Sequence, residues 1–76
     1  MSDYIHELDA QGLQCPMPLL KAKQILNRIA IGEQLRVLAT DAGSVRDFKA
    51  YTDLTDHRLI SSQQELGVYI YLIERG

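Results

Sequence analysis

The chain has 76 residues, of which 46% are hydrophobic, and its formal net charge is -2. A chain of this length is too short for two independently stable cores and has the apolar content of an ordinary globular protein, so we expect one folded domain over residues 1–76. The slight excess of acidic side chains argues against a protein that coats nucleic-acid phosphates, because such proteins carry a surplus of Lys and Arg.

The first half of the chain predicts a strand, a long helix and a second strand. Polar and apolar residues alternate over residues 4–9, as in a short strand, and a turn follows at 9–12. From Pro16 onward apolar residues recur at helical spacing, which predicts a helix of about four turns that ends at Gly32. The second strand follows, with these apolar residues alternating along it: Leu35, Val37 and Ala39.

The second half of the chain predicts another helix and a terminal hairpin. Ser44 and Asp47 have the spacing of a capping box, which places the start of a helix at Ser44. The apolar residues that we expect along one side of this helix are spaced three apart: Val45, Phe48, Tyr51 and Leu54. Two β-rich segments, 57–63 and 68–74, flank a turn at 64–67 and predict the hairpin.

The predicted order of elements is therefore βαβαββ. Helices that cross between parallel strands lie on the same face of so small a sheet, because such crossovers are nearly always right-handed. We expect an α+β fold: a two-layer α/β sandwich in which a mixed four-stranded sheet carries both helices on one face and leaves its other face partly exposed to water.

No segment of the sequence predicts a membrane span or an export signal. The longest apolar runs, 68–73 and 16–20, are far shorter than the roughly 20 residues that a membrane helix needs. Residues 1–7 are acidic and lack the basic and apolar regions of a secretory signal. We therefore expect a cytoplasmic protein that does not contact a membrane.

The most unusual passage is Cys15-Pro16-Met17-Pro18, at the start of the first predicted helix. Proline is favoured at the first helical position, so Pro16 there makes Cys15 the N-cap, and Pro18 stiffens the same turn. A free thiol has a pKa of about 8.5, and the positive end of a helix lowers it. We therefore expect an exposed thiol that ionises readily; the alternative is that Cys15 is a small buried hydrophobic residue.

Cys15 is the single cysteine of the chain. It has no partner for an internal disulfide, and no Cys or His cluster provides a zinc site, so we expect no metal and no cofactor. A cysteine hydrolase would pair its thiol with a histidine. His6 and His57 are each better explained as structural residues of strands, so chemistry at Cys15 is expected to involve a partner molecule.

Three polar residues are candidate supports for the thiol. Asp9 is either a general acid near Cys15 or the cap of the turn that follows it. Asp41 and Arg46 flank the start of the second predicted helix. There Arg46 holds an anionic sulfur and Asp41 orders the loop, or both residues only stabilise the helix end.

The first predicted helix is the basic element of an acidic chain. Lys21 and Lys23, together with Met17 beside the cysteine, form either a solvated face or a docking surface for an acidic partner. A second candidate docking patch is a stripe on the last strand, whose alternative role is to stabilise the sheet. The stripe consists of Tyr69, Tyr71 and Ile73.

Together these residues resemble the TusA/SirA family of small sulfur-carrier proteins. The resemblance covers nearly the whole chain and is carried by Leu8-Asp9-Ala10, Gly12-Leu13, the CPxP motif at 15–18, Gly32 before a strand, Asp41, Arg46-Asp47 and His57-x-Leu59. It implies a βαβαββ sandwich in which Cys15 accepts sulfane sulfur as a persulfide. The donor would be a cysteine desulfurase or a similar protein, and the acceptor a downstream sulfur-relay protein.

The resemblance also implies several possible pathways. In TusA proper the relay serves 2-thiouridine formation in tRNA, and other members act in sulfur oxidation, molybdenum-cofactor metabolism or regulation. Our leading hypothesis is a sulfurtransferase that carries a persulfide on Cys15, with Lys21, Lys23 and Arg46 as an electropositive rim and with no direct contact to nucleic acid. The alternative is a non-catalytic regulatory or protein/RNA-interaction module, although the predicted sheet lacks the basic and aromatic residues of RNA-binding platforms.

Overall fold

The computed structural model describes residues 5–76 and confirms the predicted order of elements. The elements are β1 (Ile5–Ala10), α1 (Met17–Leu26), β2 (Gln34–Ala39), α2 (Gly43–Asp53), β3 (Arg58–Glu65) and β4 (Val68–Glu74). Tyr4, the predicted first residue of the first strand, lies outside the described residues. Among the described helices, none is long and apolar enough to span a membrane.

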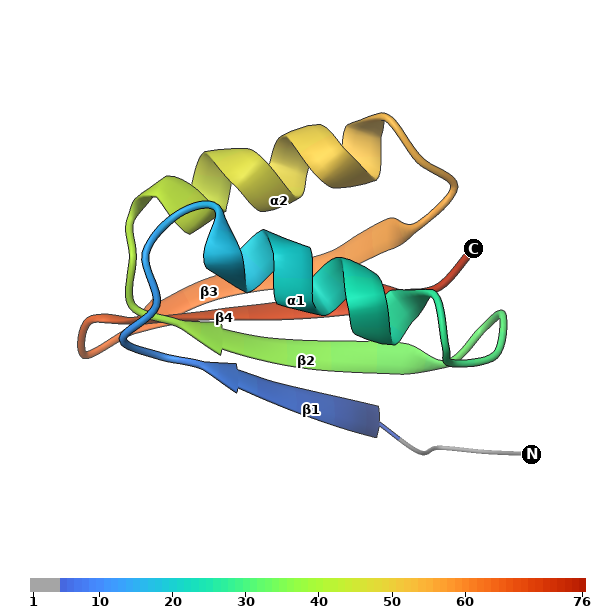
Figure 1. Ribbon diagram of the computed structural model, residues 1–76, viewed down its shortest axis with the longest axis horizontal. Helices are drawn as coiled ribbons and strands as arrows, with labels where there is room; N and C mark the ends of the chain where they lie inside the picture. The colour runs from blue at the N-terminus through green and yellow to red at the C-terminus, as the bar shows by residue number, and fades with distance from the viewer. Residues whose placement is uncertain (1–4) are drawn as a thin grey trace.

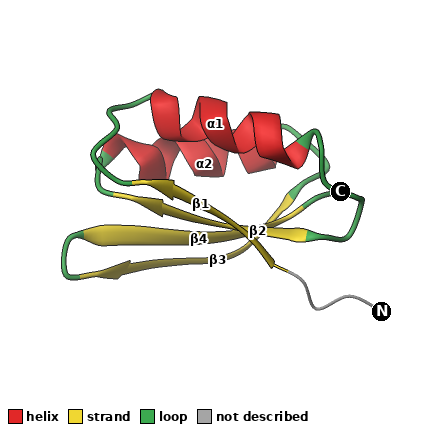
Figure 2. Ribbon diagram, turned by 60° about the horizontal axis from the view of Figure 1, so that its bottom comes forward, coloured by secondary structure: helices red, strands yellow, loops and turns green. Residues whose placement is uncertain are grey.

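The four strands form one mixed sheet in the order β1-β2-β4-β3. β1 pairs with β2 in parallel, whereas β4 pairs antiparallel with both β2 and β3. Both helices cover the same face of this sheet, and the other face has no helix over it (Figures 1 and 2). The two-layer sandwich expected from the sequence is therefore confirmed.

The topology brings the start of each helix to the same end of the molecule. α1 connects the parallel strands β1 and β2, and α2 connects β2 to β3, which runs in the same direction because both strands oppose β4. Each helix must therefore run back along the sheet. Both helix N-termini lie beside the carboxyl ends of β1 and β2, as Figure 1 shows. This end of the fold is where the chain carries Cys15.

The hydrophobic core lies between the sheet and the two helices. Alternate residues of the strands point into it, and Phe48 of α2 stacks on Tyr71 of β4 with a ring-centroid distance of 4.6 Å. The fully buried hydrophobic side chains are Ala10, Ala22, Leu26, Leu35, Val37, Ala39, Phe48, Tyr71 and Ile73. Because Tyr71 and Ile73 belong to the core, the interpretation of the last strand as an exposed docking stripe is wrong.

The first helix is shorter than predicted, since it ends at Leu26 and not near Gly32. Ile29, whose apolar character suggested a further helical turn, is buried in the core from the loop that follows. Local hydrogen bonds replace the helix there: Glu33 accepts the Ala30 N–H and contacts His6, and Arg75 donates to the Ile29 carbonyl. Helical spacing therefore identified a buried residue correctly but not its backbone conformation.

The buried side of α2 also differs from the prediction. Val45 and Leu54 are nine residues apart, which places them about 180° apart around a helix, and both are exposed, Leu54 by 86%. The buried side is instead spaced four apart and consists of Ser44, Phe48 and Thr52. Ser44 does not cap the helix as predicted; its hydroxyl lies 2.7 Å from the Tyr71 hydroxyl inside the core.

This buried pair of hydroxyls gives a prediction about stability. Tyr71→Phe is expected to lower the free energy of unfolding by about 1–3 kcal/mol, because the Ser44 hydroxyl is then buried without a partner. Urea unfolding would measure the change. The double variant with Ser44→Ala removes both polar groups and is expected to recover part of the loss. Strictly additive effects of the two substitutions would contradict an energetic link between the hydroxyls.

Candidate functional site

Cys15 is exposed and lies in the short connection between β1 and α1. The Cys15–Pro16 peptide bond is cis, and Pro16, not Cys15, is the N-cap of α1. Pro18 occupies the first turn of the helix and is buried. The Met17 N–H donates to the Gln14 carbonyl. The thiol thus lies just before the helix start, one residue earlier than predicted, and the alternative of a buried cysteine is wrong.

The start of α2 packs against Cys15 from the other side. A Cβ atom placed on Gly43, the first residue of α2, would lie 3.3 Å from Cys15 Cβ and 3.6 Å from Cys15 Sγ. The same atom would lie 2.9 Å from Asp41 Oδ2, which accepts the Gly43 N–H at 3.0 Å. Glycine is therefore the residue that lets the backbone of α2 approach the thiol, and Asp41 orders the loop before it.

Asp47 lies one turn further along α2 and contacts the sulfur directly. Cys15 Sγ donates a hydrogen bond to Asp47 Oδ2 at 2.5 Å. This bond is the main reason that the pKa of Cys15 is raised above its ordinary value, followed by partial desolvation and by the negative charges of Asp47 and Asp41. Arg46 acts in the opposite direction and lowers the pKa. The expectation of a readily ionised thiol is therefore wrong, because the carboxylates of Asp47 on α2 and of Asp41 in the loop before it both raise the pKa of the thiol.

The other predicted support residues lie at different distances from this centre. Asp41 and Arg46 are close enough to affect the charge of the thiol. The Asp9 carboxylate accepts the Gln11 N–H at 3.1 Å, as in the turn-capping interpretation. Lys23 lies between the helices, with its Nζ 5.2 Å from the centre of the Tyr51 ring, whereas Lys21 is exposed.

Both histidines are engaged away from the thiol. His6 stands near the start of β1, at the end of the sheet opposite to Cys15, and its Nε2 lies 3.1 Å from Glu33 Oε1. His57 follows the C-terminal end of α2, and its Nδ1 accepts the Gly76 N–H at 3.1 Å. Neither histidine stands near enough to form a Cys–His pair with Cys15, which agrees with the interpretation of both as structural residues.

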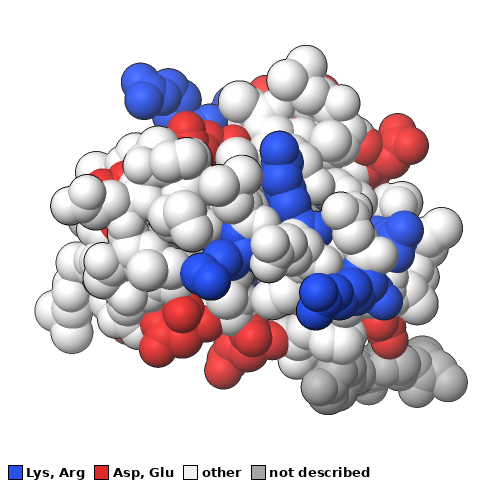
Figure 3. All heavy atoms as spheres, in the orientation of Figure 1, with Lys and Arg blue, Asp and Glu red and all other residues white. Residues whose placement is uncertain are grey.

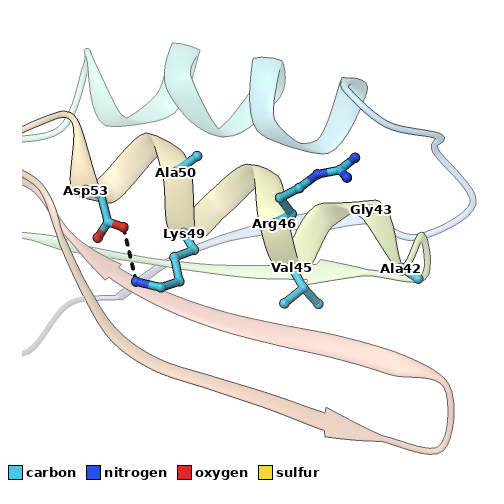
Figure 4. Close-up of a pocket in the computed structure, with 7 residues that line it drawn as sticks. All are labelled: Ala42, Gly43, Val45, Arg46, Lys49, Ala50 and Asp53. Carbon is cyan, nitrogen blue, oxygen red and sulfur yellow. Dashed lines mark hydrogen bonds and ion pairs between the residues drawn. The ribbon is translucent and has the colours of Figure 1, made fainter.

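A groove runs along the exposed side of α2, and Gly43, which packs against Cys15, is one of its lining residues. Its volume is about 550 Å³, and it begins at Ala42 and Gly43 and extends to Asp53. Figure 4 shows Arg46 extending toward α1 and Val45 and Lys49 extending the other way, with Lys49 held by Asp53. Val45 is 44% exposed, so the groove combines an apolar surface with the basic side chains of Arg46 and Lys49.

The face that carries α1 is rich in basic side chains. Lys and Arg side chains gather over α1 in the view of Figure 3, while Asp and Glu side chains appear at its margins. Exposed apolar side chains accompany them near the thiol, since Met17 is 40% and Leu20 42% exposed. The thiol therefore opens onto a surface suited to contact with another protein.

Of the three charged residues that act on the thiol, Asp47 is the one that was not predicted as a site residue. In the sequence it was assigned to a capping box with Ser44, and it lies 32 residues from Cys15. The available signal was its spacing from Gly43, because residues four apart on a helix share a face. Once Gly43 is known to face the thiol, Asp47 is expected to face it as well.

The sequence matches known proteins over nearly its whole length. Residues 6–75 match the family model described as sulfurtransferase TusA. The chain is also 47% identical, over 76 residues and the full length of both proteins, to the protein of Allochromatium vinosum named sulfur carrier protein TusA.

Proposed function

The chain belongs to the sulfurtransferase TusA family, and on that premise we propose that it is a sulfur carrier whose cargo is a persulfide on Cys15. The observation that carries this proposal is the exposed thiol at the end of the fold where both helices begin. The donor is a cysteine desulfurase or a similar persulfide protein, and the acceptor is a downstream relay protein in tRNA 2-thiouridine formation or a related route of sulfur trafficking.

The chemistry needs one sulfur atom on the carrier and two partner proteins. Cys15 attacks the terminal sulfur of the donor persulfide, the donor S–S bond breaks, and the donor leaves as a thiol. An acceptor thiol later attacks the terminal sulfur on Cys15 and restores the free carrier. Both steps exchange one S–S bond for another, so neither an oxidant nor a reductant is consumed.

The surroundings of the thiol are proposed to serve access and docking. Pro16 and Pro18 shape the turn that presents the sulfur, Asp41 holds the start of α2 in place, and Arg46 supplies positive charge. Asp9 accepts the Gln11 N–H and so stabilises the turn between β1 and Cys15.

The partner-docking surface is proposed to be Met17, Lys21 and Lys23 on α1, with Arg46 from α2 completing its rim. Exposed apolar area next to basic side chains supports a partner with an acidic loop around its own reactive cysteine. Residues 1–76 act together as a single domain in this proposal, which the family match over residues 6–75 supports.

Sulfur loading can be tested on the intact protein. After incubation with a cysteine desulfurase and cysteine, mass spectrometry is expected to show one added sulfur atom, which a reducing thiol removes. Because the chain has a single cysteine, protein alkylated beforehand is a site-specific control and is expected to gain nothing. If unmodified protein gains no sulfur from a desulfurase or from a small-molecule persulfide, the proposed carrier function is wrong.

A further inference from the structure

Asp47 contributes a negative charge at the atom where the proposed sulfur transfer takes place. Its carboxylate accepts the Cys15 S–H hydrogen bond, and Asp47 itself is only half exposed on the side of α2 that faces the thiol. The other charged groups that act on the thiol are Asp41, from the loop before α2, and Arg46, from α2. The first turn of α1 contributes no acidic residue. The thiol thus faces two carboxylates and one guanidinium.

We propose that Asp47 keeps Cys15 in its protonated form and disfavours the Cys15 thiolate in both directions of sulfur transfer. This inference rests on the proposed function of Cys15 as the persulfide site. Asp47 thus slows both the uptake and the release of sulfur, whereas Cys15 is the residue that forms the S–S bond.

In the uptake step, the thiolate of Cys15 is the attacking species. The S–H proton leaves Sγ, a new S–S bond forms to the terminal sulfur of the donor, and the donor S–S bond breaks. Its electron pair goes to the donor sulfur, which takes up a proton. Because the Asp47 carboxylate stabilises the S–H form and repels the thiolate, the free carrier reacts slowly with small electrophiles and persulfides.

In the release step, the thiolate of Cys15 is the leaving group. The acceptor thiolate attacks the terminal sulfur, and the S–S bond breaks with its electron pair going to Sγ. A thiol of higher pKa leaves more slowly. The loaded Sγ carries no hydrogen, so its hydrogen bond to Asp47 is absent, but the carboxylate still opposes the negative charge that forms beside it. The carrier therefore loses its sulfur to small thiols more slowly than it would without the charge of Asp47.

The decisive variant is Asp47→Asn, which keeps the shape of the side chain and removes its charge. The first readout is the pH profile of iodoacetamide alkylation of the unloaded protein. We expect the midpoint of this profile to move to lower pH, and the rate at neutral pH to rise about three- to fourfold for each pKa unit of the shift, because nucleophilicity falls less steeply than the thiolate fraction rises.

Three further variants make the test specific. Asp53→Asn removes the same charge from the same helix at its far end, where Asp53 pairs with Lys49, and is expected to leave the midpoint unchanged. Arg46→Gln removes the opposing positive charge and is expected to move the midpoint to higher pH. Asp47→Ser removes the same carboxylate from a half-buried position and is expected to move the midpoint in the same direction as Asp47→Asn, so it keeps the proposal testable if Asp47→Asn fails to fold.

The second readout is the release of sulfur from the loaded carrier to a small thiol, which we expect to be several-fold faster in Asp47→Asn. An alkylation midpoint equal to that of the unsubstituted protein in Asp47→Asn or in Asp47→Ser overturns the proposal. The alkylation profile needs no bound sulfur. Failure of the carrier to load would therefore refute the proposed function without changing the outcome of the alkylation test.

Discussion

Cys15→Ser is expected to abolish sulfur loading completely. Serine keeps the size of the side chain and can still donate a hydrogen bond to Asp47, but its oxygen does not form a persulfide. Intact-mass measurement after incubation with a desulfurase and cysteine is expected to show no added sulfur. Because Cys15 is exposed, the change in the free energy of unfolding should stay within about 0.5 kcal/mol, so the loss would report chemistry and not misfolding.

The same variant separates the carrier from a non-catalytic interaction module. In cells that depend on the protein, a module that acts only by binding would tolerate Cys15→Ser, whereas a carrier would fail. Retained sulfur loading in the purified variant, or full activity in cells, would contradict the role of the thiol. A melting temperature equal to that of the unsubstituted protein is the required control.

Phe48→Ala is expected to have the largest effect on stability. Phe48 is fully buried and stacks on Tyr71 at the centre of the core. Removing such a ring costs about 3–5 kcal/mol, while a natural domain has only about 5–15 kcal/mol in total and small domains lie near the lower limit. We therefore expect a chain that is largely or wholly unfolded at room temperature, as circular dichroism and urea unfolding would show.

A matched control on the same helix is Val45→Ala. Val45 was predicted to share the apolar side with Phe48, but it is 44% exposed. Its substitution is expected to change the free energy of unfolding by no more than about 0.5 kcal/mol. Comparable losses from both substitutions would contradict the assignment of the buried side of α2 to Ser44, Phe48 and Thr52.

Most of the fold could be predicted because periodicity reports burial. Leu35, Val37 and Ala39 are buried and alternate with less buried positions in β2, as expected, and the order of elements left few possible topologies. The errors arose where a residue is buried without having the backbone conformation that its spacing predicted. Ile29 is buried from a loop, and the three-residue spacing of apolar residues in α2 drifts around the helix, so its ends face solvent.

The site could be predicted only in part. Cys15 was identified because the thiol, the prolines and the helix start are neighbours in the sequence. Neighbours in the sequence are also neighbours in the folded protein. Its ionisation was predicted in the wrong direction, because the pKa depends on Asp47 and Asp41, which folding brings in from another helix and another loop. The sequence pattern showed that Cys15 lies at the start of a helix. It did not show which charged side chains of α2 and of the loop before it lie beside the thiol.

The parallel arrangement of β1 and β2 has a practical consequence for experiments. The start of β1 and the C-terminus both lie at the end of the sheet opposite to the connection between β1 and α1, which carries Cys15 (Figure 1), and a six-residue strand separates the two ends by about 20 Å. An affinity tag, a fluorophore or a further polypeptide joined at Gly76 would thus not block access to Cys15 Sγ. The protein can be immobilised on a sensor chip through its C-terminus, which leaves the Cys15 thiol accessible to partner proteins in solution.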